Sequence, residues 1–347
     1  MSVERSSGNP VARQLGGARK SVLLFFALLL LLAAVAVAAG GYCAYREAAR
    51  PGPLAQDKVI LLKPGSSVTA IAEKLSEDGV LRYPLLFKIV VKVKGQQSEL
   101  KAGEYRIPAG ASVLAVIDLL VEGKSILHYF TAAEGLTTAQ ILRLIAADET
   151  LEGEISEQPA EGALLPETYA FTRGETRDGM IRMMMKAQVK LLDDLWEGRA
   201  LELPFNTRAE AVTLASIVEK ETGVPDERPR IAAVFINRLK RGMRLESDPT
   251  IIYGLTGGEP LGRGLRVSEI KKETPYNTYI IRGLPPTPIA NPGRASIEAV
   301  LNPLETDELF FVASGDGGHV FSSTIAEHNR NVAKWRRVER EQQQGGE

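Results

Sequence analysis

The longest apolar run of the chain lies close to its N-terminus. Residues 22–39 are all apolar, and no charged residue occurs between Ser21 and Tyr45. As a helix, this run would be about 27 Å long, close to the thickness of the hydrocarbon core of a bilayer. The pattern therefore predicts one membrane-spanning helix at residues 21–45. A short linker follows at 46–56 and contains the helix-breaking sequence Arg-Pro-Gly-Pro.

Basic residues before this run predict its orientation. Arg5, Arg13, Arg19 and Lys20 lie on its N-terminal side, so the positive-inside rule places residues 1–20 in the cytoplasm as a short tail. A cleaved signal peptide is the alternative, because Ala-Val-Ala at 34–36 has the small residues of a cleavage site. We favour a retained anchor because the apolar run is longer than the usual core of a signal peptide.

The region after the linker alternates short apolar strands with amphipathic helices. In each of three copies, a strand leads through a glycine turn to a serine or threonine that can cap the next helix. The strands and helices are predicted at 59–62 and 67–77, at 105–108 and 112–123, and at 128–131 and 138–147. Their uneven spacing argues against a repeat solenoid. We expect a strand-helix module at 57–130.

The second half of the chain is predicted to be mainly helical. Helical periodicity covers 180–197, 207–223 and 226–241. Thr207 with Glu210 forms a capping box at the start of the second of these helices, and Thr324 with Glu327 begins a final helix. Residues 310–321 surround Ser-Gly-Asp-Gly-Gly and predict a β-hairpin. The whole pattern predicts an α+β protein, in which a mixed α+β domain at 131–338 follows the module and a charged tail at 339–347 ends the chain.

The composition narrows the possible functions. A formal net charge of -1 argues against a nucleic-acid partner, for which a basic patch is expected. The single cysteine, Cys43, cannot form an internal disulfide. The histidines at 128, 319 and 328 give no zinc-ligand pattern. We therefore expect neither a metal ion nor another cofactor.

A glutamate near the end of the helix at 207–223 is the strongest candidate for chemistry. The C-terminal end of a helix dipole disfavours an ionised carboxylate, so Glu219 is expected to keep a proton that it can donate as a general acid. Glu221 lies on the opposite rim of the apolar face, and periodicity does not choose between the two. The small residues Ala215 and Ser216 beside Glu219 favour a notch for a substrate there. The alternative is an ordinary solvated helix end.

Seven other residues are candidate substrate contacts. Glu167 and Tyr169 lie in Leu-Leu-Pro-Glu-Thr-Tyr-Ala-Phe, which has the aromatic residues and bends of a loop that lines a cleft. Asp248 precedes a proline at the start of a predicted helix, so a cap is the alternative to an acid. Polar contacts to a substrate are predicted for Asn237, Tyr276, Asn277 and Asn291, with capping as the alternative for the last.

Several motifs then occur in one order along the chain. They are Leu-Pro-Glu-Thr-Tyr, Ala-Ser-Ile-Val-Glu-Lys-Glu-Thr, Val-Phe-Ile-Asn-Arg-Leu, Ser-Asp-Pro-Thr-Ile-Ile-Tyr-Gly, Tyr-Asn-Thr-Tyr and Gly-Leu-Pro-Pro-x-Pro-Ile. Together with the apolar span, they resemble the MltG (YceG-like) family of endolytic murein transglycosylases over nearly all of residues 20–338. The sequence Lys-Pro-Gly-Ser-Ser-Val-Thr-Ala-Ile-Ala-Glu-Lys-Leu also resembles a LysM module, which binds glycans containing N-acetylglucosamine; a spacer is the alternative.

The resemblance implies a specific activity and site. Glu219 matches the family's catalytic glutamate, whereas Glu167 stands where the family often has aspartate, and an assisting role for Asp248 or Glu221 stays open. The implied lyase reaction cleaves the MurNAc-GlcNAc bond within nascent peptidoglycan strands, leaves a 1,6-anhydroMurNAc end and limits strand length. A periplasmic catalytic domain on the bacterial inner membrane is implied, with peptidoglycan synthases and division or elongation proteins as possible partners. A noncatalytic peptidoglycan-binding scaffold and a hydrolytic muramidase are the alternatives.

Overall fold

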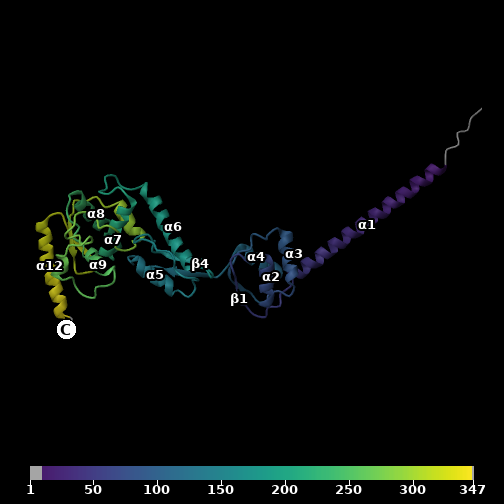
Figure 1. The fold of residues 1–347 in the computed structure, drawn as a ribbon, viewed down its shortest axis with the longest axis horizontal. Coiled ribbons are helices and arrows are strands. Elements are labelled where there is room, and N and C mark those ends of the chain that lie inside the picture. The colour runs from purple at the N-terminus through teal and green to yellow at the C-terminus, as the bar shows by residue number, and fades with distance from the viewer. Residues whose placement is uncertain (1–9, 346–347) are drawn as a thin grey trace, which may run out of the picture. The chain divides into compact units, whose positions relative to one another are not determined.

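The computed structural model describes residues 10–345, so that Arg5 of the predicted tail and the last two residues lie outside the described part. The chain divides into two compact units, Met1–Ile126 and Leu127–Glu347 (Figure 1). The three sheets in the described residues each have two antiparallel strands, and helices supply most of the remaining structure, which gives the mixed α+β class that the sequence predicts.

The first unit begins with a long helix, α1 (Pro10–Ala49). Within it, Leu23–Ala49 is long and apolar enough to cross a membrane, and it is the one helix of that kind among the described residues. The large apolar side chains from Leu23 to Val37 are exposed in the isolated chain, as expected of a segment that is covered by lipid. This finding fits a membrane anchor or a signal sequence.

The strand-helix pattern predicted for the first unit is present. Strand β1 (Lys58–Leu62) pairs with β2 (Gly103–Ile107), with Ile60 opposite Tyr105. The side chains of Ser67 and Ser112 cap the two predicted helices, each by accepting a backbone N–H. The helices of this unit after α1 are α2 (Val68–Glu77), α3 (Pro84–Lys94) and α4 (Val113–Glu122).

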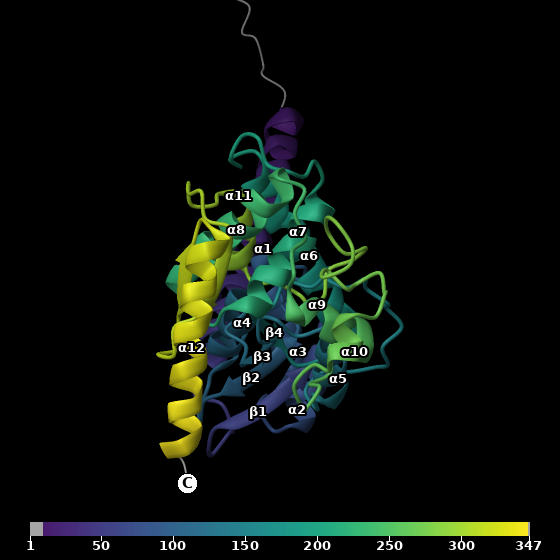
Figure 2. The same cartoon turned by 90° about the vertical axis from the view of Figure 1, so that its left-hand side faces the viewer.

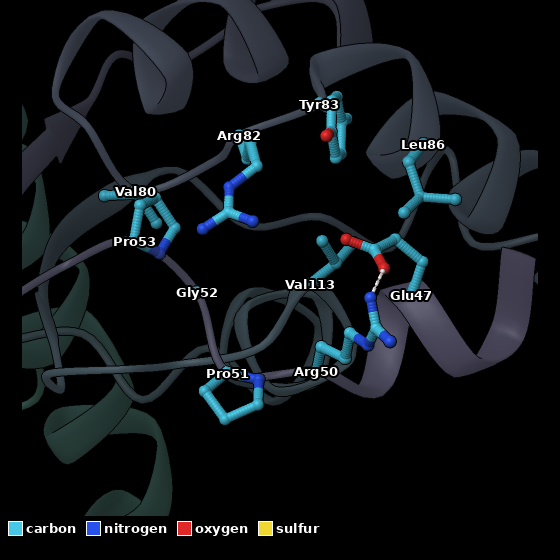
Figure 3. A pocket seen from close by; sticks show the side chains of 10 residues that line it. All are labelled: Glu47, Arg50, Pro51, Gly52, Pro53, Val80, Arg82, Tyr83, Leu86 and Val113. Carbon is cyan, nitrogen blue, oxygen red and sulfur yellow. Dashed lines mark hydrogen bonds and ion pairs between the residues drawn. The ribbon is translucent and has the colours of Figure 1, made fainter.

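A tight turn connects α1 to the rest of this unit. Arg50 pairs with Glu47 in the last turn of α1 at 2.8 Å. Gly52 then passes so close to the backbone that an added Cβ would lie 2.3 Å from the carbonyl oxygen of Ala111, so only glycine fits there. Figure 3 shows this turn beside Tyr83 and the start of α3. The end of α1 therefore packs against α3 and α4.

The second unit opens with a strand pair that packs on two helices. Strand β3 (Leu127–Thr131) pairs with β4 (Thr168–Thr172), so this segment, placed in the first module by the sequence prediction, is bonded within the second unit. The helices that cover this pair are α5 (Thr138–Ala147), whose Thr137 and Gln140 form a capping box, and α6 (Arg177–Trp196). Phe130 and Phe171 pack with both helices in one core.

A second core lies around α7 (Arg208–Glu221), whose predicted capping box of Thr207 and Glu210 is confirmed. Helix α11 (Arg294–Leu301) packs on α7 and on α8 (Arg228–Lys240), and Figure 2 shows the three side by side. The predicted hairpin is also confirmed. The remaining elements are α9 (Asp248–Thr256), α10 (Val267–Ile270), β5 (Phe310–Ala313), β6 (His319–Ser322) and α12 (Ile325–Gly345).

Candidate active site

Glu219 lies in the last turn of α7, and its side chain is 6% exposed. Its Oε2 accepts hydrogen bonds from the backbone N–H of Gly293 at 3.0 Å and from the hydroxyl of Ser296 at 2.7 Å. Its Oε1 lies 3.6 Å from a guanidinium nitrogen of Arg228. Each of these partners is a donor or a cation, and two of them belong to the start of α11. In this arrangement Glu219 joins α7 to α11.

The space that the sequence predicted beside Glu219 is occupied by a loop. The Ser216 hydroxyl accepts the N–H of Ile289 at 3.0 Å, and residues 289–293 are buried against α7. The small residues of α7 therefore accommodate the proline-rich loop.

Arg228 also lies 3.6 Å from Glu134, and burial raises the pKa of that second carboxyl.

Glu221 contacts a different part of the second unit. Its Oε1 accepts a hydrogen bond from the Ser247 hydroxyl at 2.5 Å, immediately before α9 begins. The carboxyl lines a pocket of about 470 Å³, which we call the Glu221 pocket. The other residues that line it are Arg238, Leu245, Glu246, Asp248, Tyr279, Phe311, Val312 and His328.

Three carboxyl groups line the Glu221 pocket, those of Glu221, Glu246 and Asp248, and the first and last of them lie in different environments. Burial raises the pKa of Glu221 to about 7, and the charge of Asp248 acts in the same direction, whereas the Ser247 hydroxyl opposes both. Asp248 Oδ1 accepts a hydrogen bond from the Tyr279 hydroxyl at 2.8 Å. Burial raises the pKa of Tyr279, which keeps this hydroxyl protonated as a donor. Near neutral pH the pocket can therefore present a protonated Glu221, which is what general acid catalysis requires.

Arg238 from α8 forms one wall of the pocket. Its Nε donates to the carbonyl of Leu309 at 2.7 Å, and its Nη1 donates to the carbonyl of Leu245 at 2.8 Å and to Glu246 at 3.1 Å. Glu246 has a φ of 55°, in the left-handed region that residues other than glycine rarely adopt. Backbone strain of this kind concentrates at functional sites.

Two of the predicted substrate contacts are enclosed in the fold. Asn277 and Asn291 are both fully buried. The Nδ2 of Asn277 donates to the carbonyls of Ile270 and Lys272 at 2.9 and 2.7 Å. The Oδ1 of Asn291 accepts the N–H of Leu164 at 3.0 Å. In this conformation both amides hold loops together and have no exposed surface for a ligand.

The other predicted contacts are dispersed, and of the seven only Asp248 joins Glu221. Asn237 and Tyr169 each donate to a backbone carbonyl, at 2.7 Å in both cases. Glu167 is exposed just before β4. The ring of Tyr276 lies 5.0 Å from that of Tyr253.

Tyr253 belongs to a second pocket of about 450 Å³, which we call the Tyr253 pocket. Lys220 and Pro249 line it, and these residues are the chain neighbours of Glu221 and Asp248 in the first pocket. The two pockets therefore flank the same junction between the end of α7 and the start of α9. An extended ligand that crosses this junction would contact both.

Several residues of the Glu221 pocket were not among the sequence candidates. Arg238 and Tyr279 occur in the motifs Val-Phe-Ile-Asn-Arg-Leu and Tyr-Asn-Thr-Tyr. These motifs indicated a site, but the sequence prediction selected the asparagines in them, Asn237 and Asn277. Glu246 and His328 come from a loop and from α12, and nothing local in the sequence marks them. His328 stacks on the ring of Phe310 at 5.1 Å.

Comparison with known proteins gives one consistent family. Residues 60–334 match the model of the YceG-like family. An endolytic murein transglycosylase of Bacillus subtilis is 34% identical, over 78% of this chain and 82% of its own length. A protein of the same name from Streptococcus pneumoniae is 28% identical over 86% of this chain, which spans 62% of that relative. A crystal structure of a putative YceG-like protein from Listeria monocytogenes aligns with a TM-score of 0.47 at 28% identity, covering 79% of this chain and 98% of that one.

Proposed function

The chain belongs to the YceG-like family, and we propose that it is an endolytic murein transglycosylase that cleaves peptidoglycan strands internally. The observation that carries this proposal is the Glu221 pocket, in which a carboxyl lies beside Asp248 and burial raises its pKa to about 7. A scaffold that only binds glycan does not need a buried acid, because burying a carboxyl that can ionise costs stability.

The reaction requires one group that first donates and then accepts a proton. In our proposal the Glu221 carboxyl donates its proton to the glycosidic oxygen as that oxygen leaves C1 of N-acetylmuramic acid. The resulting carboxylate takes the proton from the C6 hydroxyl of the same sugar while the C6 oxygen bonds to C1. Glu221 ends protonated, no water is consumed, and the product is a 1,6-anhydro ring. The ionised Asp248 stabilises the positive charge that develops at C1.

We assign the acid to Glu221 in preference to Glu219, which the sequence favoured. The contacts of Glu219 are two hydrogen-bond donors and a guanidinium, and they connect its carboxyl to the start of α11 and to α8. Glu221 receives one hydroxyl hydrogen bond and faces a pocket that also contains Asp248. Burial of Glu221 outweighs the opposing effects of the Ser247 hydroxyl and the Arg238 guanidinium, so its environment favours the neutral acid.

Two isosteric variants test this choice. Glu221→Gln keeps the size of the side chain and removes the transferable proton, so strand cleavage should fall at least about 100-fold. Glu219→Gln serves as the matched control from the same helix turn and should retain most activity in whatever fraction folds. Loss of activity in a folded Glu219→Gln protein, with activity kept in Glu221→Gln, would return the assignment to Glu219.

Product analysis tests the reaction class. Mass spectrometry of purified glycan strands treated with the full-length protein should show fragments that lack one water relative to hydrolytic products. Long fragments should precede disaccharides, because the cuts are internal. Ordinary reducing ends would identify a hydrolytic muramidase that uses the carboxyls of Glu221 and Asp248. Strands that stay intact would instead support the scaffold.

The location and the first unit complete the proposal. A retained α1 anchors the protein in the inner membrane with its N-terminus in the cytoplasm and both units in the periplasm, near peptidoglycan synthases and the division or elongation proteins. The region after α1 in the first unit acts as a LysM-like glycan-binding module. A reporter fused to the C-terminus should be active only as an exported reporter, and retention of the chain in membranes after a high-salt wash distinguishes an anchor from a cleaved signal.

A further inference from the structure

Helix α3 of the first unit has apolar side chains on two opposite sides. Phe87 and Val91 are fully buried in the core, whereas Leu85, Ile89 and Val93 are 63%, 46% and 82% exposed. At about 100° per residue, the three exposed residues lie about 40° apart and form a stripe opposite the buried pair. A stripe of large apolar residues on a soluble surface is a mark of an interaction site.

The stripe adjoins the part of α1 that follows the apolar span. A pocket of about 470 Å³ has Ile89 and Val93 of α3 on one side and Gly41 and Tyr45 of α1 on the other. These α1 residues come directly after the apolar run at 22–39. An α1 that crosses a bilayer therefore carries the stripe to the level at which the helix leaves the hydrocarbon.

Aromatic and basic residues around the stripe match the same level of a bilayer. Tyr42 and Tyr45 of α1 are 62% and 61% exposed, and tyrosine is enriched at the membrane-water interface. On α3, Lys92 is exposed and Lys88 is partly exposed, and both flank one edge of the stripe. Lysines at the edge of an apolar face bind the phosphates of lipid headgroups while the apolar residues enter the acyl boundary.

We propose that α3 is an interfacial helix whose stripe of Leu85, Ile89 and Val93 lies in the surface of the bilayer that α1 crosses. This inference rests on the retained anchor of the proposed function. The occupant is the lipid surface, because the pocket between the stripe and α1 is lined mainly by uncharged residues, with the paired Lys94 and Asp118 as the charged residues among them. The contact fixes the orientation of the first unit relative to the membrane.

Site-specific labels in vesicles test the proposal with the full-length chain. Cys43 is exposed and is first replaced by serine, so that one introduced cysteine carries the dye NBD. The test positions are Ile89→Cys and Val93→Cys. The positive control is Leu30→Cys in the span, and the matched negative control is Val59→Cys, an exposed apolar residue of β1, which lies farther from α1 than α3 does (Figure 1).

The variants are reconstituted into vesicles of phosphatidylcholine and phosphatidylglycerol that contain a doxyl-labelled lipid. Quenching by this lipid at positions 89 and 93 should exceed that at 59 by at least about two-fold, with a matching loss of quenching by aqueous iodide. If iodide quenches the label at position 93 as strongly as the label at position 59, while lipid still quenches the label of Leu30→Cys, the proposal is overturned and the anchor is kept. Protection from iodide without quenching by lipid would also overturn it, because a second copy or another protein would then cover the stripe. Absence of lipid quenching at position 30 would overturn the anchor itself.

Discussion

Replacing Glu221 with glutamine is expected to stabilise the protein at alkaline pH while it removes activity. The pKa of Glu221 in the folded protein is about 7, above the ordinary value of 4.5. Between these two pH values the folded protein keeps a proton that the unfolded chain releases, so wild-type stability falls as the pH rises. Above pH 7 the ionised Glu221 destabilises the fold by about 3 kcal/mol, since each tenfold change in proton affinity corresponds to roughly 1.4 kcal/mol.

Glutamine carries no charge at any pH, and its side-chain oxygen can still accept the hydrogen bond from Ser247. The free energy of unfolding of Glu221→Gln should therefore exceed that of the wild type by up to about 3 kcal/mol near pH 8.5 and equal it near pH 4. Urea unfolding of the full-length protein in detergent, followed by tryptophan fluorescence, measures the second unit. Trp196 and Trp335 are the two tryptophans of the chain, and both lie in that unit.

Glu210→Gln is a control with the opposite sign. The backbone N–H of Asn206 and the capping contacts of Thr207 hold the pKa of Glu210 below its ordinary value, so this carboxyl contributes stability above that value and loses it as the pH falls. The free energy of unfolding of Glu210→Gln should be lower than that of the wild type at neutral pH and equal to it at acidic pH. Two results would refute the reasoning. One is a free energy of unfolding of Glu221→Gln that exceeds that of the wild type by the same amount at pH 4 and pH 8.5, and the other is a wild type that is more stable than the variant at pH 8.5.

Three further predictions concern the same unit. The alkaline limb of the pH dependence of the cleavage rate should lie near pH 7. It should shift to lower pH in Asp248→Asn and to higher pH in Ser247→Ala, because Asp248 raises and Ser247 lowers the pKa of Glu221. A shift in the same direction in both variants would contradict this assignment. Asn291→Ala should lower the free energy of unfolding by about 1–3 kcal/mol through unpaired buried partners, with KM for glycan strands unchanged in the folded protein; a selective rise in KM would return Asn291 to the binding site. Chelators should leave the rate unchanged, since the sequence has no zinc-ligand pattern and the proposed steps use one carboxyl; inhibition that added metal reverses would show otherwise.

The elements that local sequence determines were predicted well. The caps at Ser67, Ser112 and Thr207 are confirmed because each depends on a side chain and a backbone N–H a few residues apart. Helix α3 was not predicted. Its apolar residues face both the core and the exposed stripe, so the segment lacks the one-sided periodicity that marks a surface helix.

The site residues were harder to predict because their roles depend on partners that are distant in sequence. Asn277 and Asn291 look like ligands for a sugar when read alone, yet their partners are carbonyls and N–H groups of other loops. Arg238 and Tyr279 look like ordinary helix and turn residues, yet they line the Glu221 pocket. Burial decides between these roles, and burial is fixed by the tertiary fold.

The choice between Glu219 and Glu221 shows the same dependence in its sharpest form. Both carboxyls lie near the C-terminal end of α7, so the helix dipole acts on both and cannot by itself distinguish them. Because Glu219 and Glu221 are two residues apart on the helix, their side chains point about 200° apart. Glu219 therefore points toward the start of α11 and Glu221 toward α9. The first meets the donors of Gly293 and Ser296, whereas the second is buried in a pocket that contains both Asp248 and Arg238. In the proposed mechanism the acid is therefore selected by desolvation in the pocket, and variants that admit water to the Glu221 pocket should lower the pKa of Glu221 even though α7 is unchanged.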